Sequence, residues 1–331
     1  MQQAMLKSDF AIRRGAHRGP LRLVWAMGAL VAALLLGGCA GTPMTDRLTQ
    51  SPPDGLPAQI ELTDTPFFPQ TAYYCGPATM AALLEGTGLE TTPEAIAGAL
   101  FTPGRSGTLQ SDVIAAARRN GRLAIRVDGM LDAFAEVADG RPILILQNLG
   151  LSIAPQWHYA LLIGYDLDRK QAILRSGTTR RLVNDLSLLE YTWARGDFWG
   201  ISVNRPEGPV PATATLTDWM GEAAGVERAG RHQSAATAYL TAARHWPTAA
   251  QPWLALGNLE FSAGDLAQSE AALRNAVQRA PDNDAALNNL AYVLLRRDQR
   301  DEAEATARRA IALDGPNRAE AEATLAEILG D

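Results

Sequence analysis

The chain has little cysteine and little histidine: two cysteines, Cys39 and Cys75, and four histidines among 331 residues. Two cysteines cannot build a disulfide framework, and no histidines or cysteines are spaced as zinc ligands. The chain also lacks a Gly-rich phosphate loop with its Lys-Ser/Thr pair. We therefore expect neither a metal nor another cofactor. The length and a hydrophobic content of 47% are typical of two globular domains with additional segments.

No apolar run is long enough for a good transmembrane helix, which needs about 20 residues. The run at 23–36 follows five basic residues and ends in Leu36-Gly37-Gly38-Cys39. This pattern is typical of an export signal, so residues 1–38 are predicted to be a signal peptide. The alternative is an uncleaved anchor with an incidental cysteine.

The ending at Cys39 resembles a bacterial lipobox, which implies lipidation of the Cys39 thiol. By the same resemblance to Gram-negative lipoproteins, Ala40 in place of an aspartate implies sorting to the outer membrane. We therefore expect an exported, lipid-anchored protein on the periplasmic face of that membrane. The acyl chains would then supply the membrane affinity.

The net charge argues against nucleic acid as a partner. Removal of residues 1–38 leaves 25 basic and 35 acidic residues, a formal net charge of −10. A chain of this charge repels a phosphate backbone. Cys75 is then the only free thiol of the mature protein.

The remaining chain divides into four parts. Residues 39–58 are rich in proline and small residues without apolar periodicity, which predicts a flexible tether. Residues 59–205 show helical patterns first and strand patterns afterwards, which indicates an α+β domain. The predicted helices are 76–85, 92–100 and 109–120, and the predicted strands are 122–127, 143–147, 159–165 and 172–175, with a hairpin turn at 166–169. A proline-rich linker, 206–216, follows.

Residues 217–329 repeat with a period of 34 residues. Trp219, Trp253 and Leu287 are in step, and three further columns of glycine, alanine and proline positions keep the same spacing. The period and residue types resemble about three tetratricopeptide repeats, which are all-α. Such arrays build a concave surface that commonly binds peptides or partner proteins, although a rigid spacer is the alternative.

Cys75 is predicted to begin a helix, because Pro77 suits the first helical turn. Unpaired N-H groups and the positive dipole end there favour a thiolate. Between residues 40 and 230 the chain has one histidine, His158, at the start of a predicted strand. Taken alone, each residue is more often a core cysteine or a sheet-edge histidine. Together they indicate a nucleophile and its base.

Gln70, Cys75-Gly76-Pro77-Ala78 and the run from His158 to Tyr165 resemble the bacteriocin-processing, C39-like cysteine peptidases. These papain-like enzymes trim double-glycine leaders. The resemblance implies that Cys75 attacks a carbonyl, that His158 carries the proton, and that Gln70 helps to form the oxyanion hole.

The third catalytic residue departs from this family, which has an aspartate where the chain reads Leu174-Arg175-Ser176-Gly177. Asp166 lies about 26 Å along the strand from His158, too far to orient its ring. Strand pairing brings residues 176–178 and Gln147 or Asn148 near the histidine instead. Asn148 is the tentative orienting residue, and Ser176 is the second choice.

These features predict a membrane-tethered cysteine peptidase with a repeat domain that binds substrate or a protein partner. Two alternatives use the same residues. The domain could be an inactive peptidase-like adaptor, or the thiol could transfer an acyl group to an amine.

Overall fold

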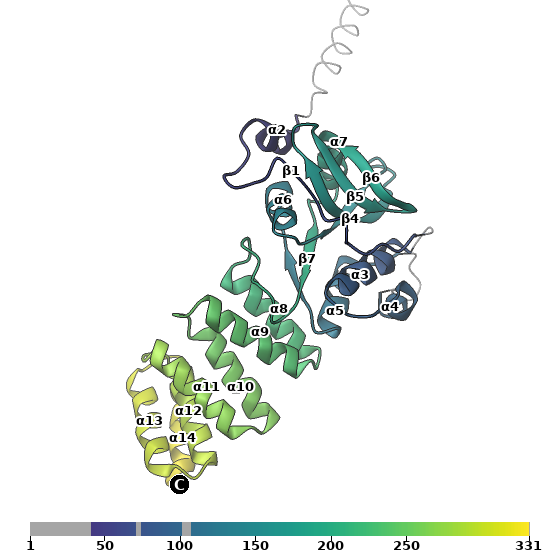
Figure 1. The fold of residues 1–331 in the computed structure, drawn as a ribbon. Helices are drawn as coiled ribbons and strands as arrows, with labels where there is room; N and C mark the ends of the chain where they lie inside the picture. Colours follow the sequence, from purple (N-terminus) through teal and green to yellow (C-terminus); the bar gives the residue numbers. More distant parts are fainter. Residues whose placement is uncertain (1–40, 71–73, 101–106, 331) are drawn as a thin grey trace, which may run out of the picture. The chain divides into compact units, whose positions relative to one another are not determined.

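A computed structural model describes residues 41–70, 74–100 and 107–330 (Figure 1). The predicted signal peptide, 1–38, and the predicted lipidation site, Cys39, lie outside these residues. Residues from Met44 onward form one compact unit. Within the part that the structure describes, no helix is both long enough and apolar enough to cross a bilayer.

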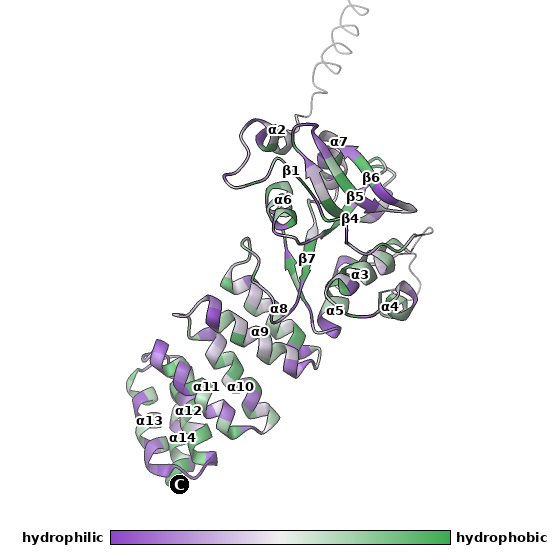
Figure 2. Cartoon of the chain, viewed as in Figure 1, coloured by the Kyte–Doolittle hydropathy of each residue, from purple (hydrophilic) through white to green (hydrophobic). Residues whose placement is uncertain are grey.

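The N-terminal domain is α+β, as the sequence predicts. Its sheet has the strand order β2-β7-β3-β4-β5-β6, with β1 also paired to β4, and every pairing is antiparallel. The strands are β1 (Gln59–Glu61), β2 (Leu123–Arg126), β3 (Ile143–Asn148), β4 (Trp157–Asp166), β5 (Gln171–Ser176), β6 (Thr179–Asp185) and β7 (Gly200–Asn204). Figure 2 shows apolar residues along β7.

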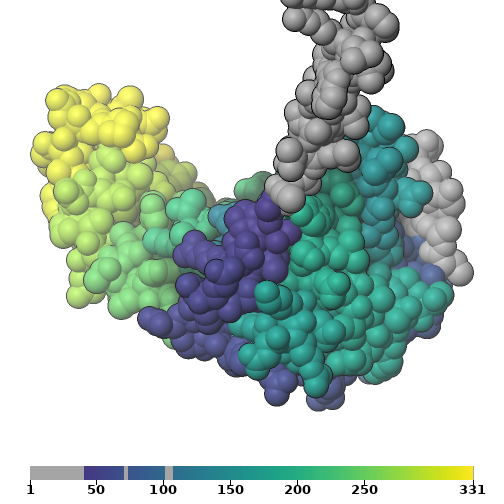
Figure 3. Space-filling model, turned by 90° about the horizontal axis from the view of Figure 1, so that it is seen from above, coloured from purple at the N-terminus to yellow at the C-terminus, as the bar shows by residue number. Residues whose placement is uncertain are grey.

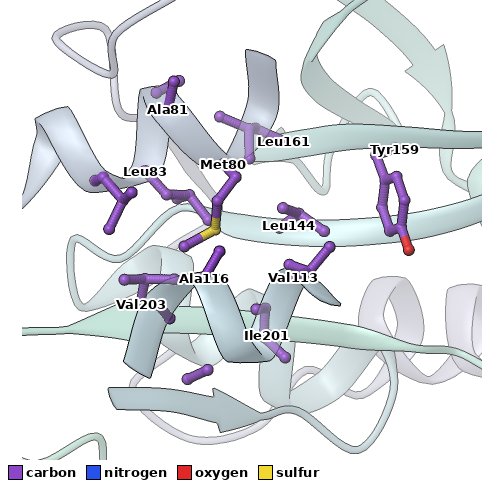
Figure 4. Packing of buried hydrophobic residues seen from close by; sticks show 14 of the residues in the cluster. Met80, Ala81, Leu83, Val113, Ala116, Leu144, Tyr159, Leu161, Ile201 and Val203 are labelled. Carbon is purple, nitrogen blue, oxygen red and sulfur yellow. The ribbon is translucent and has the colours of Figure 1, made fainter. Parts of the chain in front are cut away.

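Side chains that alternate along β4 enter two separate cores. Tyr159 and Leu161 pack against the helices that precede the sheet in sequence, and Figure 4 shows this cluster closing around Met80. Ala160 and Leu162 pack on the opposite face against later helices. Because both faces of β4 are buried, its sequence is a continuous apolar run. The first face is covered by α3 (Cys75–Gly86), α4 (Pro93–Leu100) and α5 (Gln110–Arg119), and the second by α6 (Met130–Ala138) and α7 (Leu186–Ala194).

Part of the predicted flexible tether is a docked helix, which corrects that prediction. Helix α2 (Pro43–Gln50) buries Leu48 completely. The carboxylate of Glu190 on α7 accepts hydrogen bonds from the first backbone N-H groups of α2, at Met44 (3.1 Å) and Thr45 (2.8 Å). Figure 3 shows the residues that follow α2, in purple, along the surface of the sheet domain. A single leucine and a carboxylate 145 residues away leave no local sequence pattern.

The C-terminal part is the predicted helical array. It contains α8 (Leu216–Arg228), α9 (His232–His245), α10 (Gln251–Ala263), α11 (Leu266–Arg279), α12 (Asp284–Arg296), α13 (Arg300–Ala312) and α14 (Arg318–Leu329). Among the described residues, consecutive helices pack as the three pairs α8/α9, α10/α11 and α12/α13, and α14 packs on the last pair. The predicted linker is not a loose connection, because Val210 is buried with Trp219 against Ile125 of β2.

Candidate active site

Cys75 is the first residue of α3, as predicted, and its side chain is half-buried. The helix has no side-chain cap at its N-terminus, and the N-H of Ala78 bonds back to the Tyr74 carbonyl (3.0 Å). The first N-H groups of a helix have no partner within the helix, and together with the helix dipole they favour a negative charge beside the thiol.

Gly76 allows the start of α3 to pack closely against Thr108. A β-carbon at this position would collide with the side chain of Thr108. The Thr108 carbonyl in turn accepts a hydrogen bond from the hydroxyl of Tyr159 (3.2 Å). Burial, and the nearby charge of Cys75, raise the pKa of Tyr159. Cys75 packs against the apolar cluster that contains Tyr159, the neighbour of the predicted base.

His158, the second residue of β4, is held by Ser176. Its Nε2 atom lies 2.8 Å from the Ser176 hydroxyl oxygen, and this contact leaves Nδ1 as the other ring nitrogen for chemistry. The pairing of Leu161 with Arg175 sets this register and places Ser176 on the same face as His158. In the described residues no hydrogen bond joins the Cys75 thiol to the imidazole. Such contacts are often long in a ligand-free enzyme and shorten when substrate binds.

The structure does not bring Asn148, the first choice as orienting residue, to His158. Asn148 pairs with Trp157, and Gln147 pairs with His158. The Asn148 side chain therefore projects from the face of the sheet opposite to that of His158. Its carboxamide oxygen accepts the N-H groups of Gly150 (3.0 Å) and Gln156 (2.9 Å). This corrects the expectation, because a one-residue change of register reverses the face.

Gln147 shares the face of His158, but its carboxamide donates to Thr192 on α7 (2.6 Å). Its role is thus to join β3 to that helix. Ser176 is the side chain that contacts the imidazole.

Gln70 lies beside Ser176. Its backbone N-H donates to the Gly177 carbonyl (3.0 Å), and its side chain is buried. The carboxamide oxygen has no partner within the described residues. This oxygen can only accept a hydrogen bond, so the predicted oxyanion role falls to the carboxamide N-H groups of the same side chain.

Arg175 fixes the chain that leads to Gln70, and sequence reasoning missed it. Its guanidinium is buried and donates to the carbonyls of Thr63 (2.8 Å), Thr65 (3.3 Å) and Arg180. The signal in the sequence was an arginine inside an otherwise apolar strand, because a buried cation must satisfy its donors internally.

Loss of the Ser176 hydroxyl is expected to impair peptide cleavage through the orientation of His158. We expect Ser176→Ala to lower kcat by about 10- to 100-fold with little change in KM, because a misplaced base costs rate and not binding. Ser176→Asn, which keeps a hydrogen-bonding group, should recover part of the loss. Thr179→Ala, in the same hairpin, is the matched control. Equal kcat values for Ser176→Ala and the control would contradict the role.

The burial of His158 has a consequence for stability. Desolvation lowers its pKa below the usual 6.5, so the folded protein binds this proton less readily than the unfolded chain. The corresponding stability is fully present above about pH 6.5 and is lost as the pH falls through the folded pKa. Between about pH 7 and pH 5, the free energy of unfolding in urea should fall more for the wild type than for His158→Gln. Parallel curves would disprove this.

The repeats contain a separate groove, with a volume of about 430 Å³. Asn258 of α10 accepts a hydrogen bond from Asn289 of α12 (2.9 Å), and Phe261 meets Tyr292 edge to face. Glu320 is its one charged lining residue within the described chain. The groove thus offers amides and aromatic rings, with a negative charge at its edge.

The α+β domain, with Cys75 at the start of α3 and His158 at the start of β4, resembles a peptidase-type domain. Residues 62–185 match the family model of peptidase C39-like proteins, so the chain carries a C39-like domain. Residues 226–272 and 254–318 match the model of tetratricopeptide repeats, which confirms the repeat array. No curated protein matches the chain.

Solved structures resemble each half separately. A putative C39-like peptidase from Bacillus anthracis shares 16% identity over 44% of this chain and 96% of its own, with a TM-score of 0.37. The first repeat domain of Spaghetti (RPAP3), bound to an HSP90 peptide, shares 17% identity over 35% and 90%, with a TM-score of 0.33. The Yersinia enterocolitica chaperone SycD, in complex with a YopD peptide, shares 17% over 34% and 92%, with a TM-score of 0.32.

Proposed function

We propose that the protein is a lipid-anchored cysteine peptidase whose repeats bind a substrate or partner peptide. The observation that carries the peptidase proposal is the contact between His158 Nε2 and the Ser176 hydroxyl. It supports a role for the histidine as the base, because it holds the ring and leaves Nδ1 for the thiol. The match of residues 62–185 to the C39-like family supports the same chemistry.

In the proposed reaction, Nδ1 of His158 takes the proton of the Cys75 thiol, and the thiolate attacks a peptide carbonyl carbon. The oxyanion that forms is stabilised by hydrogen bonds from the Cys75 N-H and from the carboxamide N-H groups of Gln70. The imidazolium gives its proton to the leaving amine, which departs and leaves an acyl-enzyme. His158 then takes a proton from water, which attacks the thioester and releases the acid and the thiol.

Ser176 is a neutral orienting residue. Its hydroxyl can fix the ring and the tautomer of His158, but it stabilises an imidazolium less than a carboxylate does. We therefore propose a peptidase slower than relatives with an aspartate.

The lipid anchor and the outer membrane location belong to the same proposal. Their support is the sequence that ends at Cys39. The repeat groove supports the binding of a peptide, since its aromatic rings and amides suit a polypeptide backbone with apolar side chains. Glu320 makes an acidic peptide a poor ligand.

The proposed activity is tested by alkylation of the catalytic thiol. The mature chain is incubated with a peptidyl acyloxymethyl ketone, an acyl probe from which an active-site thiolate displaces the carboxylate to form a thioether, and the adduct is located by mass spectrometry. Stoichiometric modification of Cys75, slowed by His158→Ala, is the expected result. If the probe does not modify Cys75 faster than it modifies free cysteine, the domain is an inactive adaptor.

A further inference from the structure

Residues 149–157, which comprise the loop between β3 and β4 and the first residue of β4, form an exposed apolar hairpin. Its sequence is Leu-Gly-Leu-Ser-Ile-Ala-Pro-Gln-Trp, without a charged residue. Leu151 is 67% exposed, Ile153 92% and Trp157 55%. Large apolar side chains gathered in this way on a surface mark a site of interaction.

The 149–157 hairpin is held rigidly at its base. Its ends are joined by the bond from the Leu149 N-H to the Gln156 carbonyl (2.9 Å), and the N-H of Ala154 donates to the Leu151 carbonyl (3.0 Å). The carboxamide oxygen of Asn148 accepts two further N-H groups of the hairpin. The apolar side chains are therefore presented to solvent by an ordered backbone.

Helix α7 joins the hairpin base to the start of the described chain. Arg195, which caps α7, donates to the Asn148 carbonyl (2.8 Å), while Glu190 of the same helix holds the N-terminus of α2. Five residues of helix rise by about 7.5 Å. The base of the hairpin and the N-terminus of α2 are thus attached about one and a half turns apart on one helix.

The predicted lipid site is close to this point along the chain. Cys39 precedes Met44 by five residues, which span at most about 18 Å when fully extended. Any lipid on Cys39 would therefore keep α2, and with it α7, near the bilayer surface. The segment between Cys39 and Met44 is too short to let the domain move far from the bilayer.

We propose that the 149–157 hairpin inserts its apolar tip into the interfacial layer of the membrane. The inference rests on the proposed lipid anchor. A membrane fits the observations better than a peptide does, because the side chains project into solvent from a hairpin tip, where Ile153 is 92% exposed. Trp157 suits the boundary between headgroups and acyl chains, and Leu151 and Ile153 suit the acyl region. Since His158 follows Trp157 directly, the catalytic histidine would lie near the bilayer, where membrane-proximal polypeptides are the accessible substrates.

The test measures binding to vesicles without the lipid anchor. Residues 41–331, which contain the complete compact unit, are floated with vesicles of phosphatidylethanolamine and phosphatidylglycerol. We expect the wild type to bind the vesicles. The double variant Leu151→Ser, Ile153→Ser should bind at least about tenfold more weakly. Leu313→Ser, at an exposed leucine of the repeats, is the matched control and should bind as the wild type does.

Two results would overturn the proposal: a wild type that does not bind the vesicles, or a double variant that binds them equally well. A double variant with unchanged vesicle binding and a raised KM for peptides would make the hairpin a peptide-docking surface. Labelling of Cys75 by the acyl probe in the same samples separates this from the proposed activity. Vesicle binding without labelling leaves the hairpin proposal standing and refutes the peptidase.

Discussion

Replacement of Cys75 by alanine is expected to abolish peptide cleavage, with a loss on the order of 10⁴-fold or more in kcat/KM. The thiol is the atom that forms the acyl-enzyme in the proposed reaction, and Cys75 is the one cysteine of the described chain. His158→Ala should give a loss of similar size, because no base remains to take the proton of the thiol or to give it to the leaving amine. The measurement is the rate of cleavage of a peptide that the wild type accepts.

The double variant Cys75→Ala, His158→Ala separates a catalytic pair from two independent effects. Groups that act as one unit give non-additive losses, so the double variant should be no slower than Cys75→Ala. His232→Ala, at an exposed histidine of the repeats, is the control for general effects of removing an imidazole. Wild-type cleavage by His158→Ala would contradict the pairing.

The sequence was sufficient where local chemistry decides the structure. Pro77 marks the start of α3, and the turn at 166–169 leads from β4 into β5, as expected. The 34-residue period likewise predicts the helical repeats. These elements depend on residues that are close together in the chain, so their patterns are visible without a fold.

The sequence was insufficient where distant residues decide the structure. Helix α2 depends on Glu190, and its own apolar face consists only of Met44 and Leu48, which is too little to predict a helix. Strand β6 was missed because it lies at the sheet edge and is largely polar. The choice between Asn148 and Ser176 required the register of β3 on β4, because a shift of one residue exchanges the two faces.

The contact between Ser176 and His158 links the fold to the proposed chemistry. Three consecutive residues at the β5-β6 turn make contacts that build the site. The Ser176 hydroxyl contacts the imidazole of His158, and the Gly177 carbonyl accepts the backbone N-H of Gln70. The Arg175 guanidinium donates to the chain at 63–65. One turn thus positions both the base and the proposed oxyanion donor. A change in the β5-β6 pairing would displace both at once.

The joint between the sheet and the repeats is the site of the largest expected effect on stability. Trp219 of α8 is completely buried, with its ring N-H donating to the Ala238 carbonyl (2.9 Å), and it packs with Ile125 of β2. Beside it, Arg118 and Glu222 form a two-point ion pair, and Glu222 also accepts the N-H of Ala124 (3.2 Å). Apolar packing and a hydrogen-bonded ion pair thus join α8 to the sheet domain.

Trp219→Ala is therefore expected to lower the free energy of unfolding by about 3 to 5 kcal/mol, since it removes a large buried side chain and leaves a cavity. Because the ring belongs to a core shared by β2 and α8, the loss should also separate one cooperative unfolding transition into two. Trp253→Ala, at a tryptophan that is only partly buried beneath the guanidinium of Arg279, is the control and should cost less. Urea unfolding followed by circular dichroism and by tryptophan fluorescence measures both effects. Equal losses for the two variants, with a single transition in each, would show that the sheet and the repeats do not depend on this joint for their cooperativity.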